Sequence, residues 1–220
     1  MMKKLLFGAV ILGVTMMYSC SGTSTKDKTT SDSTNVKKDE SKETPKGKYQ
    51  IKSGIISITS EAMGFKTDVV SYFDNYGAQE TSVSTMDIMG MKTERLSINK
   101  DGFIWDIDMK TKTGTKMKIP EKDPKNIDFT GLTEGLMKEM NIKKEGTETL
   151  LGKTCDKFSM NYEKMKTKAN YSVWKGIALK TEMDMMGMKV KMIATKLEEN
   201  ATIAADKFEV PAGVKIKDIK

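Results

Sequence analysis

The sequence contains no histidine, two cysteines and a single arginine, Arg95, in 220 residues. Histidine is the usual general base near neutral pH and the commonest metal ligand, so its absence excludes Ser-His and Cys-His catalytic arrangements. Carboxylate pairs such as Asp106 with Asp108 stand two residues apart, as on a solvated strand face. The C-x-x-C, H-E-x-x-H, Walker and G-x-G-x-x-G spacings are missing too. We therefore expect no enzyme, no cofactor and no conventional metal site.

Long apolar runs are also missing. The run from Leu5 to Met17 is too short to cross a membrane as a helix, which needs about twenty residues. It follows two lysines and precedes a small residue and Cys20, which is typical of an export signal. The stretch Met17-Tyr18-Ser19-Cys20 resembles a relaxed bacterial lipobox, which implies removal of residues 1–19 and acylation of Cys20. The alternative is a secreted protein with a chance cysteine.

Residues 20–46 lack the apolar side chains that a core needs. Between Ser21 and Lys46 there is no aromatic residue and only one branched aliphatic residue, Val36. Such a composition predicts a disordered tether. Ser21 lacks the Asp that resembles an inner-membrane retention signal, so the outer membrane of a Gram-negative bacterium is favoured. If Cys20 is acylated, Cys155 has no disulfide partner and is expected to be a buried, inert thiol.

Residues 47–220 are long enough for one domain with its own core. The net charge of +7 falls to about +5 once Lys3 and Lys4 are removed, and the lysines are dispersed along the chain. Without a basic block interleaved with aromatic residues, nucleic-acid binding is not expected. A mild attraction to anionic lipid headgroups fits this pattern better.

Alternation of apolar and polar residues predicts a mainly β domain. In FIWDID, Phe103, Trp105 and Ile107 share one face, while Asp106 and Asp108 share the other. Glycine turns recur between such segments, which predicts an antiparallel meander of about ten to twelve strands. The expected turns are at Met63-Gly64, Asn75-Tyr76-Gly77, Met89-Gly90, Lys100-Asp101-Gly102, Lys112-Thr113-Gly114, Leu151-Gly152, Lys175-Gly176 and Met186-Gly187.

One tetrapeptide, Met-Gly-Met/Phe-Lys, occurs three times, in EAMGFK (61–66), MDIMGMK (86–92) and MDMMGMK (183–189). Each copy lies where two alternating segments meet, which favours a repeated hairpin turn. The alternative is thioether coordination of monovalent copper or silver, because soft sulfur ligands suit soft metals. In a strand, however, adjacent methionines point to opposite faces.

Residues 128–144 depart from the strand pattern. Apolar residues recur there at steps of three and four, which predicts a short amphipathic helix ending before Gly146, with Thr130 as a possible N-cap. Gly131 and Gly135 weaken it by about 1 kcal/mol each. We expect this helix to lie across the concave face of the sheet.

The C-terminal stretches YSVWKGIALKTEM (171–183) and ATKLEENATIAADKFEVPAG (194–213) carry a family likeness. They resemble the ending of the LolA/LolB-like lipoprotein-carrier superfamily, and more closely a related, uncharacterised family of exported bacterial lipoproteins. YFDNYG (72–77) and LLGKTCDKF (150–158) resemble that family as well. The resemblance implies a curved antiparallel sheet, an incomplete barrel, with helix over a concave apolar face. In the carriers that face receives acyl chains.

The leading hypothesis is a non-enzymatic, membrane-anchored envelope lipoprotein that binds a lipid or other apolar ligand between sheet and helix. Methionine is flexible and suits a cavity that accepts variable chains. The expected lining residues are Trp105, Phe129, Leu132, Leu136, Met137, Met140, Met183, Met188, Val190 and Met192. These side chains could equally fill a core. The alternative functions are docking of another envelope protein and binding of monovalent copper or silver through methionine.

Overall fold

The computed structural model describes residues 47–88, 90–120 and 126–219. The predicted signal peptide (1–19) and the tether with Cys20 (20–46) lie outside the described residues. All described residues belong to one compact unit of the chain. Within them, no helix is long and apolar enough to cross a membrane.

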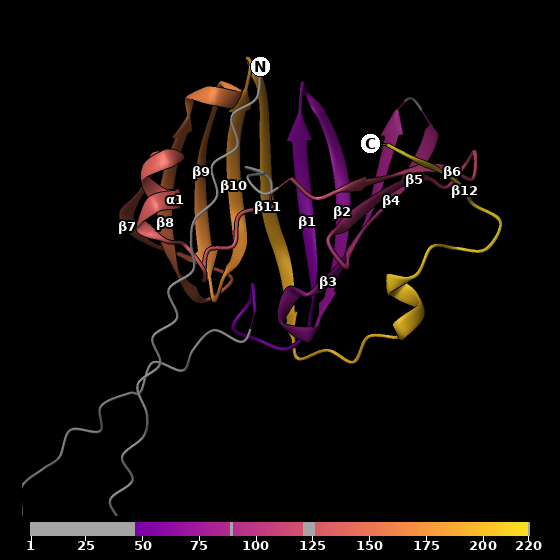
Figure 1. The fold of residues 1–220 in the computed structure, drawn as a ribbon, viewed down its shortest axis with the longest axis horizontal. Coiled ribbons are helices and arrows are strands. Elements are labelled where there is room, and N and C mark those ends of the chain that lie inside the picture. The colour runs from indigo at the N-terminus through magenta and orange to yellow at the C-terminus, as the bar shows by residue number, and fades with distance from the viewer. Residues whose placement is uncertain (1–46, 89, 121–125, 220) are drawn as a thin grey trace, which may run out of the picture. The chain divides into compact units, whose positions relative to one another are not determined.

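The predicted β architecture is confirmed, since twelve strands form a single sheet with two free edges (Figure 1). The spatial order is β12-β6-β5-β4-β3-β2-β1-β11-β10-β9-β8-β7. Every pairing is antiparallel except that of β12 with β6, which is parallel. The strands are β1 Gly54–Ala62, β2 Phe65–Asp74, β3 Gln79–Ile88, β4 Met91–Lys100, β5 Phe103–Asp108, β6 Thr113–Lys118, β7 Ile142–Leu150, β8 Lys153–Tyr162, β9 Thr167–Trp174, β10 Ile177–Met185, β11 Met188–Glu199 and β12 Lys215–Asp218.

The pairing register defines two faces, because residues directly opposite each other on neighbouring strands point to the same side. On the face we call the front, Ala62, Val190, Met183, Ala169 and Met160 are successive partners across five strands. The face we call the back carries Ile55, Tyr72, Thr81, Ile98 and Trp105, which are likewise successive partners.

Different segments cover the two faces. Residues 127–140 cover the front face of β8–β10, where Met140, Met160 and Tyr171 are buried. On the back face of β3–β6, Leu96, Ile98 and Ile107 are buried beneath the C-terminal segment that contains η3 (Ala205–Phe208). This segment is held by the Thr81 hydroxyl, which donates to the Lys207 carbonyl at 2.8 Å. The remaining short helices are η1 (Asn75–Gly77) and η2 (Glu163–Met165).

The helix is shorter than predicted. α1 spans Glu134–Glu139, and its N-cap is Thr133, whose hydroxyl accepts the Leu136 N–H at 3.2 Å. The expected N-cap Thr130 was wrong because Asp128 Oδ1 accepts the N–H groups of Thr130 and Gly131 at 2.9 Å each. That local turn satisfies the backbone outside a helix.

The C-terminal part of the predicted helix is also wrong, because Ile142 already begins β7 and pairs with Met160 of β8.

The Met-Gly turns are confirmed as hairpin turns. Met63 and Gly64 have φ of 53° and 81°, and Met186 and Gly187 have φ of 53° and 86°. In each case the flanking residues pair directly, so the turn has two residues, with two positive φ values as in a type I′ turn. Gly90 follows the same pattern with φ of 79°, although Met89 lies outside the described residues. The turn predicted at 112–114 is shifted, because Thr113 and Gly114 already belong to β6.

Candidate functional site

The interior beneath residues 126–140, which we call the cover segment, gathers six of the ten predicted lining residues. Figure 1 shows α1, at the end of this segment, beside β7 and β8. Phe129, Leu132, Leu136 and Met137 of the cover segment pack onto a buried cluster that includes Met140, at the end of this segment, and Met183 of the front face. The predicted stripe therefore does face the sheet.

This interior is rich in methionine and aromatic side chains. Met140, Met160 and Met183 are buried, and Met137 and Met185 lie partly buried around them. The Phe129 ring lies 5.1 Å from that of Tyr171 and 5.3 Å from that of Phe158, measured between centroids. Thioethers on three rotatable bonds adapt to neighbours of variable shape, so such an interior tolerates rearrangement better than one of branched residues.

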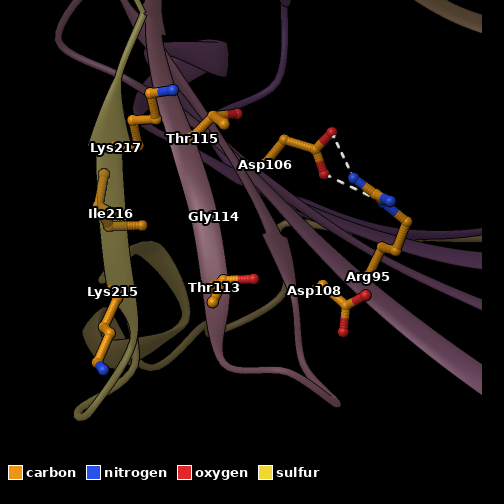
Figure 2. A pocket seen from close by; sticks show the side chains of 9 residues that line it. All are labelled: Arg95, Asp106, Asp108, Thr113, Gly114, Thr115, Lys215, Ile216 and Lys217. Atoms are coloured by element: carbon orange, nitrogen blue, oxygen red, sulfur yellow. Dashed lines mark hydrogen bonds and ion pairs between the residues drawn. The ribbon is translucent and has the colours of Figure 1, made fainter.

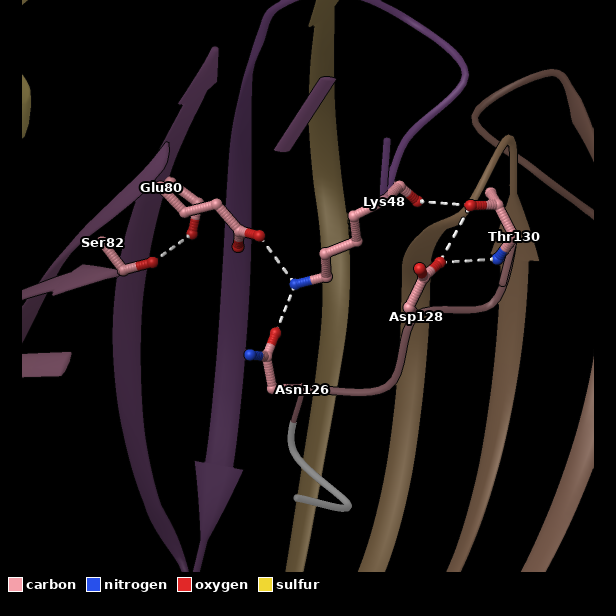
Figure 3. Close-up of polar contacts among 7 residues, drawn as sticks. Lys48, Glu80, Ser82, Asn126, Asp128 and Thr130 are labelled. Carbon is pink, nitrogen blue, oxygen red and sulfur yellow. Dashed lines mark hydrogen bonds and ion pairs between the residues drawn. The ribbon is translucent and has the colours of Figure 1, made fainter. Parts of the chain in front are cut away.

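A small polar network, which we call the latch, holds the start of the cover segment (Figure 3). The Thr130 hydroxyl lies 2.9 Å from the Gly47 carbonyl oxygen and 2.8 Å from Asp128 Oδ1, and it has one proton to donate. Lys48 Nζ donates to Glu80 Oε1 at 2.6 Å and also to Asn126 Oδ1. The latch thus joins residues 47–48, strand β3 and the cover segment.

Tyr49 lies next to the latch and is buried. Burial, with the neighbouring carboxylate of Glu80, raises the pKa of the Tyr49 phenol well above its usual value. Its ring meets Phe73 edge-on at 4.7 Å between centroids. The residues around the latch are therefore part of a packed core, and the ionised groups, Lys48 and Glu80, compensate each other.

The other four predicted lining residues lie elsewhere. Trp105 is on the back face, in the cluster with Ile98 and Ile107, and so cannot line a space beneath α1. Met188 is 52% exposed at the start of β11. Val190 and Met192 are half-buried on the front face of β11 and lie outside the cluster beneath α1.

Four surface hollows among the described residues have volumes of about 460 to 710 Å³, and none is lined by the cover segment. At the interface between the cover segment and the sheet, Phe129, Leu132, Leu136 and Met137 pack against the buried cluster. Of the predicted lining residues, Met183 and Val190 border the largest hollow, together with Met63 and several lysines.

Figure 2 shows a hollow of about 530 Å³ between β4, β5, β6 and β12. Arg95, the single arginine, forms a two-pronged ion pair with Asp106, at 2.9 and 3.2 Å. Asp108 Oδ1 accepts the N–H groups of Lys110 and Thr111, and these bonds lower the pKa of its carboxyl group. A general acid needs the opposite shift. Arg95 and Asp106 pair with each other, and Asp108 accepts backbone N–H groups. These three charged side chains therefore have a structural role at the surface.

Among the residues that the structure describes, no group of three or more His, Cys, Asp or Glu side chains is placed to hold a metal ion. Cys155 is free and buried, and burial raises the pKa of its thiol. The latch residues Lys48, Glu80 and Asn126 were not predicted. Only Asp128-Phe-Thr-Gly carried a local signal, since Asp followed by Thr and Gly is typical of a side-chain-capped turn.

No family model matches the chain, and no curated protein matches it in sequence. Its fold is similar to that of an uncharacterised conserved protein from Thermus thermophilus, with 7% identity, a TM-score of 0.52, and coverage of 76% of this chain and 91% of that one. A chain of the Pseudomonas aeruginosa MucA/MucB complex aligns with 13% identity and a TM-score of 0.48, over 76% of this chain and 58% of its own length.

A candidate outer membrane lipoprotein-sorting protein domain from Vibrio parahaemolyticus aligns with 8% identity and a TM-score of 0.39, over 71% of this chain and 89% of that domain. At these identities the likeness concerns the fold alone. The chain spans less than two thirds of the aligned MucA/MucB chain. Membership of the lipoprotein-carrier superfamily therefore stays a prediction.

Proposed function

We propose that this protein is a non-enzymatic envelope lipoprotein, anchored through acyl chains on Cys20, that binds a lipid or other apolar ligand beneath the cover segment. The observation that carries the proposal is the methionine-rich cluster between the sheet and a cover held by few polar contacts. The ligand would take the place of the cover side chains that now fill this interface.

The chemistry of the cluster supports an acyl chain as ligand. Each methylene moved from water into the interior gains about 0.8 kcal/mol, so a chain of ordinary length binds without directional contacts. Methionines can change rotamer to accept it, as they do on other surfaces that bind variable apolar partners. No charged side chain belongs to this cluster of described residues, so the ligand's polar end would remain at the edge of the cover.

Opening of the cover is supported by its construction. α1 has only six residues, below the length at which a helix is stable in isolation, so it depends on its packing. Residues 128–133 are irregular and are fixed mainly by Thr130 and Asp128. Releasing the latch would remove the polar contacts at the start of the cover without breaking any strand pairing.

The latch variant Thr130→Val tests the ligand site. Valine keeps the shape but removes the one hydrogen bond that the hydroxyl proton can make, worth about 1 kcal/mol, so opening should become about fivefold more favourable. The measurement is uptake of a fluorescent fatty acid by the purified protein, which should be faster and tighter in the variant. Thr195→Val is the matched control, because that hydroxyl donates to Ser57 on an exposed strand away from the cover.

Equal probe binding by Thr130→Val, Thr195→Val and the parent protein would contradict a ligand site beneath the cover. Native mass spectrometry after mild extraction gives an independent reading, with co-purified lipid expected. The anchor is tested separately by Cys20→Ser, which should lose the acyl mass. An unchanged mass would refute the anchor but leave the ligand site standing.

A further inference from the structure

Large exposed apolar side chains gather at one end of the sheet. Nine large hydrophobic side chains are exposed among the described residues, and six belong to turns at this end: Met63, Phe65, Met91, Met165, Met186 and Met188. Met63 is 76% exposed and Met186 is 74% exposed. We call this end the methionine rim.

The pairing register places these turns side by side. Ala62, the last residue of β1, pairs with Phe65 of β2 on one side and with Val190 of β11 on the other. Strand β11 begins at Met188, two residues before Val190. Thr67 pairs with Met86 near the end of β3, and Thr167 of β9 pairs with Met185. The turn at 163–166 is bonded to the next one, since the Met186 N–H donates to the Lys166 carbonyl at 3.2 Å. The turns at 63–64, 163–166 and 186–187 lie at the upper end of Figure 1.

Two of the three copies of the repeated tetrapeptide share one hydrogen bond within the turn. The Gly90 N–H donates to Asp87 Oδ1 at 2.8 Å, and the Gly187 N–H donates to Asp184 Oδ1 at 2.9 Å. Glu61 occupies the same position in the third copy. Aspartate and glycine therefore make the turn, and the exposed methionine beside the glycine takes no part in its hydrogen bonding. Turn formation explains Gly and Asp, but it does not explain Met.

The rim also carries an excess of positive charge. Within two residues of its five turns, counting the turn at 109–112, there are eight lysines and five carboxylates. The lysines are Lys66, Lys92, Lys110, Lys112, Lys164, Lys166, Lys168 and Lys189, and the carboxylates are Glu61, Asp87, Asp108, Glu163 and Asp184. A lysine follows each Gly-Met or Gly-Phe pair. Apolar tips flanked by lysines match the boundary between acyl chains and anionic headgroups.

The spacing of the tips favours a bilayer over a protein surface. Neighbouring hairpins stand about 10 Å apart, two strand spacings, so the methionines project as separate points. Protein interfaces gain most of their affinity from closely packed central clusters. A fluid bilayer instead accepts each side chain independently, without a complementary shape.

We propose that the methionine rim is a membrane-binding edge, which inserts Met63, Phe65, Met91, Met186 and Met188 at the surface of an anionic bilayer while the adjacent lysines bind headgroups. This site lies at the end of the strands, away from the latch, and does not depend on a ligand beneath the cover segment. It would hold the domain against a membrane in addition to any anchor on Cys20.

The test uses the chain without residues 1–19 and with Cys20→Ser, so that no acyl anchor contributes. Co-sedimentation is measured with vesicles of phosphatidylcholine and phosphatidylglycerol, and with vesicles of phosphatidylcholine alone. We expect binding to the mixed vesicles, weaker binding to the neutral ones, and loss of binding at high salt. The double variant M63N/M186N should bind at least about tenfold more weakly, because two apolar side chains are lost.

This variant separates function from folding. Asn adopts positive φ more readily than Met, so M63N/M186N should keep or raise the melting temperature while losing vesicle binding. L151N is the matched control, because Leu151 precedes Gly152 in a two-residue turn at the other end of the sheet and is 41% exposed. It should bind vesicles like the parent.

Unaltered vesicle binding in M63N/M186N, or equal losses in both variants, would overturn the proposal. So would a dimer in light scattering that M63N/M186N dissociates, in a protein that binds no vesicles, because the rim would then bind a second copy. Tight binding of monovalent copper without vesicle binding would likewise assign the methionines to metal.

Discussion

Both ends of the sheet contain two-residue glycine turns, but residues 47–50 pack against only one of the two ends. At the end opposite the methionine rim, residues 47–50 pack over two of the four turns, so a Cβ on Gly77 would lie 2.7 Å from Tyr49 Cδ2 and one on Gly176 would overlap the Lys48 carbonyl oxygen, whereas Gly102 and Gly152 have open space. At the rim, Gly64, Gly90 and Gly187 have open space on that side. Lys175 and Asp101 adopt the same positive φ as Met63 and Met186. Methionine at the first position of the two-residue turns is therefore found at one end only, and the turn type does not require it.

The charges differ in the same way. Around the four turns of the opposite end there are three lysines, Lys100, Lys153 and Lys175, and two carboxylates, Asp74 and Asp101. Residues 47–50 thus pack against two turns of one end, which is nearly neutral, whereas the other end is apolar at its tips and basic. The contacts of residues 47–50 stabilise the fold, whereas the exposed methionines of the rim have no evident stabilising role.

The largest expected difference is between glycines at the two ends. Gly176→Ala should lower the free energy of unfolding by about 3–4 kcal/mol, because positive φ and overlap with Lys48 act together. Gly187→Ala has only the backbone term and should cost about 1–2 kcal/mol. Urea unfolding of both variants measures this. Equal losses would mean that residues 47–50 do not fasten the opposite end.

Oxidation should distinguish exposed from buried methionines. Dilute hydrogen peroxide should convert Met63 and Met186 to sulfoxides at least about tenfold faster than Met140 and Met160, because access controls the rate. Peptide mass spectrometry over a time course gives each rate. Similar rates at all four sites would show that the cover opens as fast as the reagent reacts.

A smaller loss is expected from the turn carboxylates. Asp184→Ala removes the acceptor for the Gly187 N–H and should cost about 1 kcal/mol in thermal or urea unfolding. Glu182→Ala serves as its control, since its contacts with Lys180 and Lys191 are 3.7 Å surface ion pairs. Such pairs contribute little. A greater loss at Glu182 would argue that the back-face charge network matters more than the turn.

The smallest effect is expected from Cys155. Burial raises its folded pKa above the ordinary thiol value of 9.0, so the unfolded chain releases the proton first. Stability is then retained below that value and falls as the pH rises above it. Cys155→Ala should flatten this alkaline decline in unfolding measurements, and an unchanged slope would assign the decline to other groups.

The sheet could be predicted because apolar–polar alternation and glycine turns are patterns of residues close together in the sequence. Alternation in FIWDID placed Ile107 and Trp105 on one apolar face, and glycine marked most of the hairpins. The helix was predicted on the correct face of the sheet, but the predicted helix was too long. The Asp128 side chain accepts backbone N–H groups that a helix would use. Lys143 and Lys144, which lie within the predicted helix, are strand residues paired with β8.

Long-range features could not be predicted. The parallel pairing of β12 with β6 joins residues about a hundred positions apart, and KIKD alone is an indistinct strand. Trp105 was assigned to the wrong side because alternation tells which residues share a face, but not which cover that face receives. The latch depends on Lys48, Glu80 and Asn126 meeting in space, and no motif links them in sequence.

The two edge strands of the sheet determine whether copies of the protein can associate when they are concentrated on a membrane. One edge is β12, a strand of only four residues, of which Lys215, Lys217 and Asp218 are charged. The other, β7, carries Lys143, Lys144 and Glu145 and a register shift between Lys144 and Gly146. Charges and an irregular register oppose the addition of a foreign strand. Crowded copies would therefore remain separate particles and would not polymerise edge to edge.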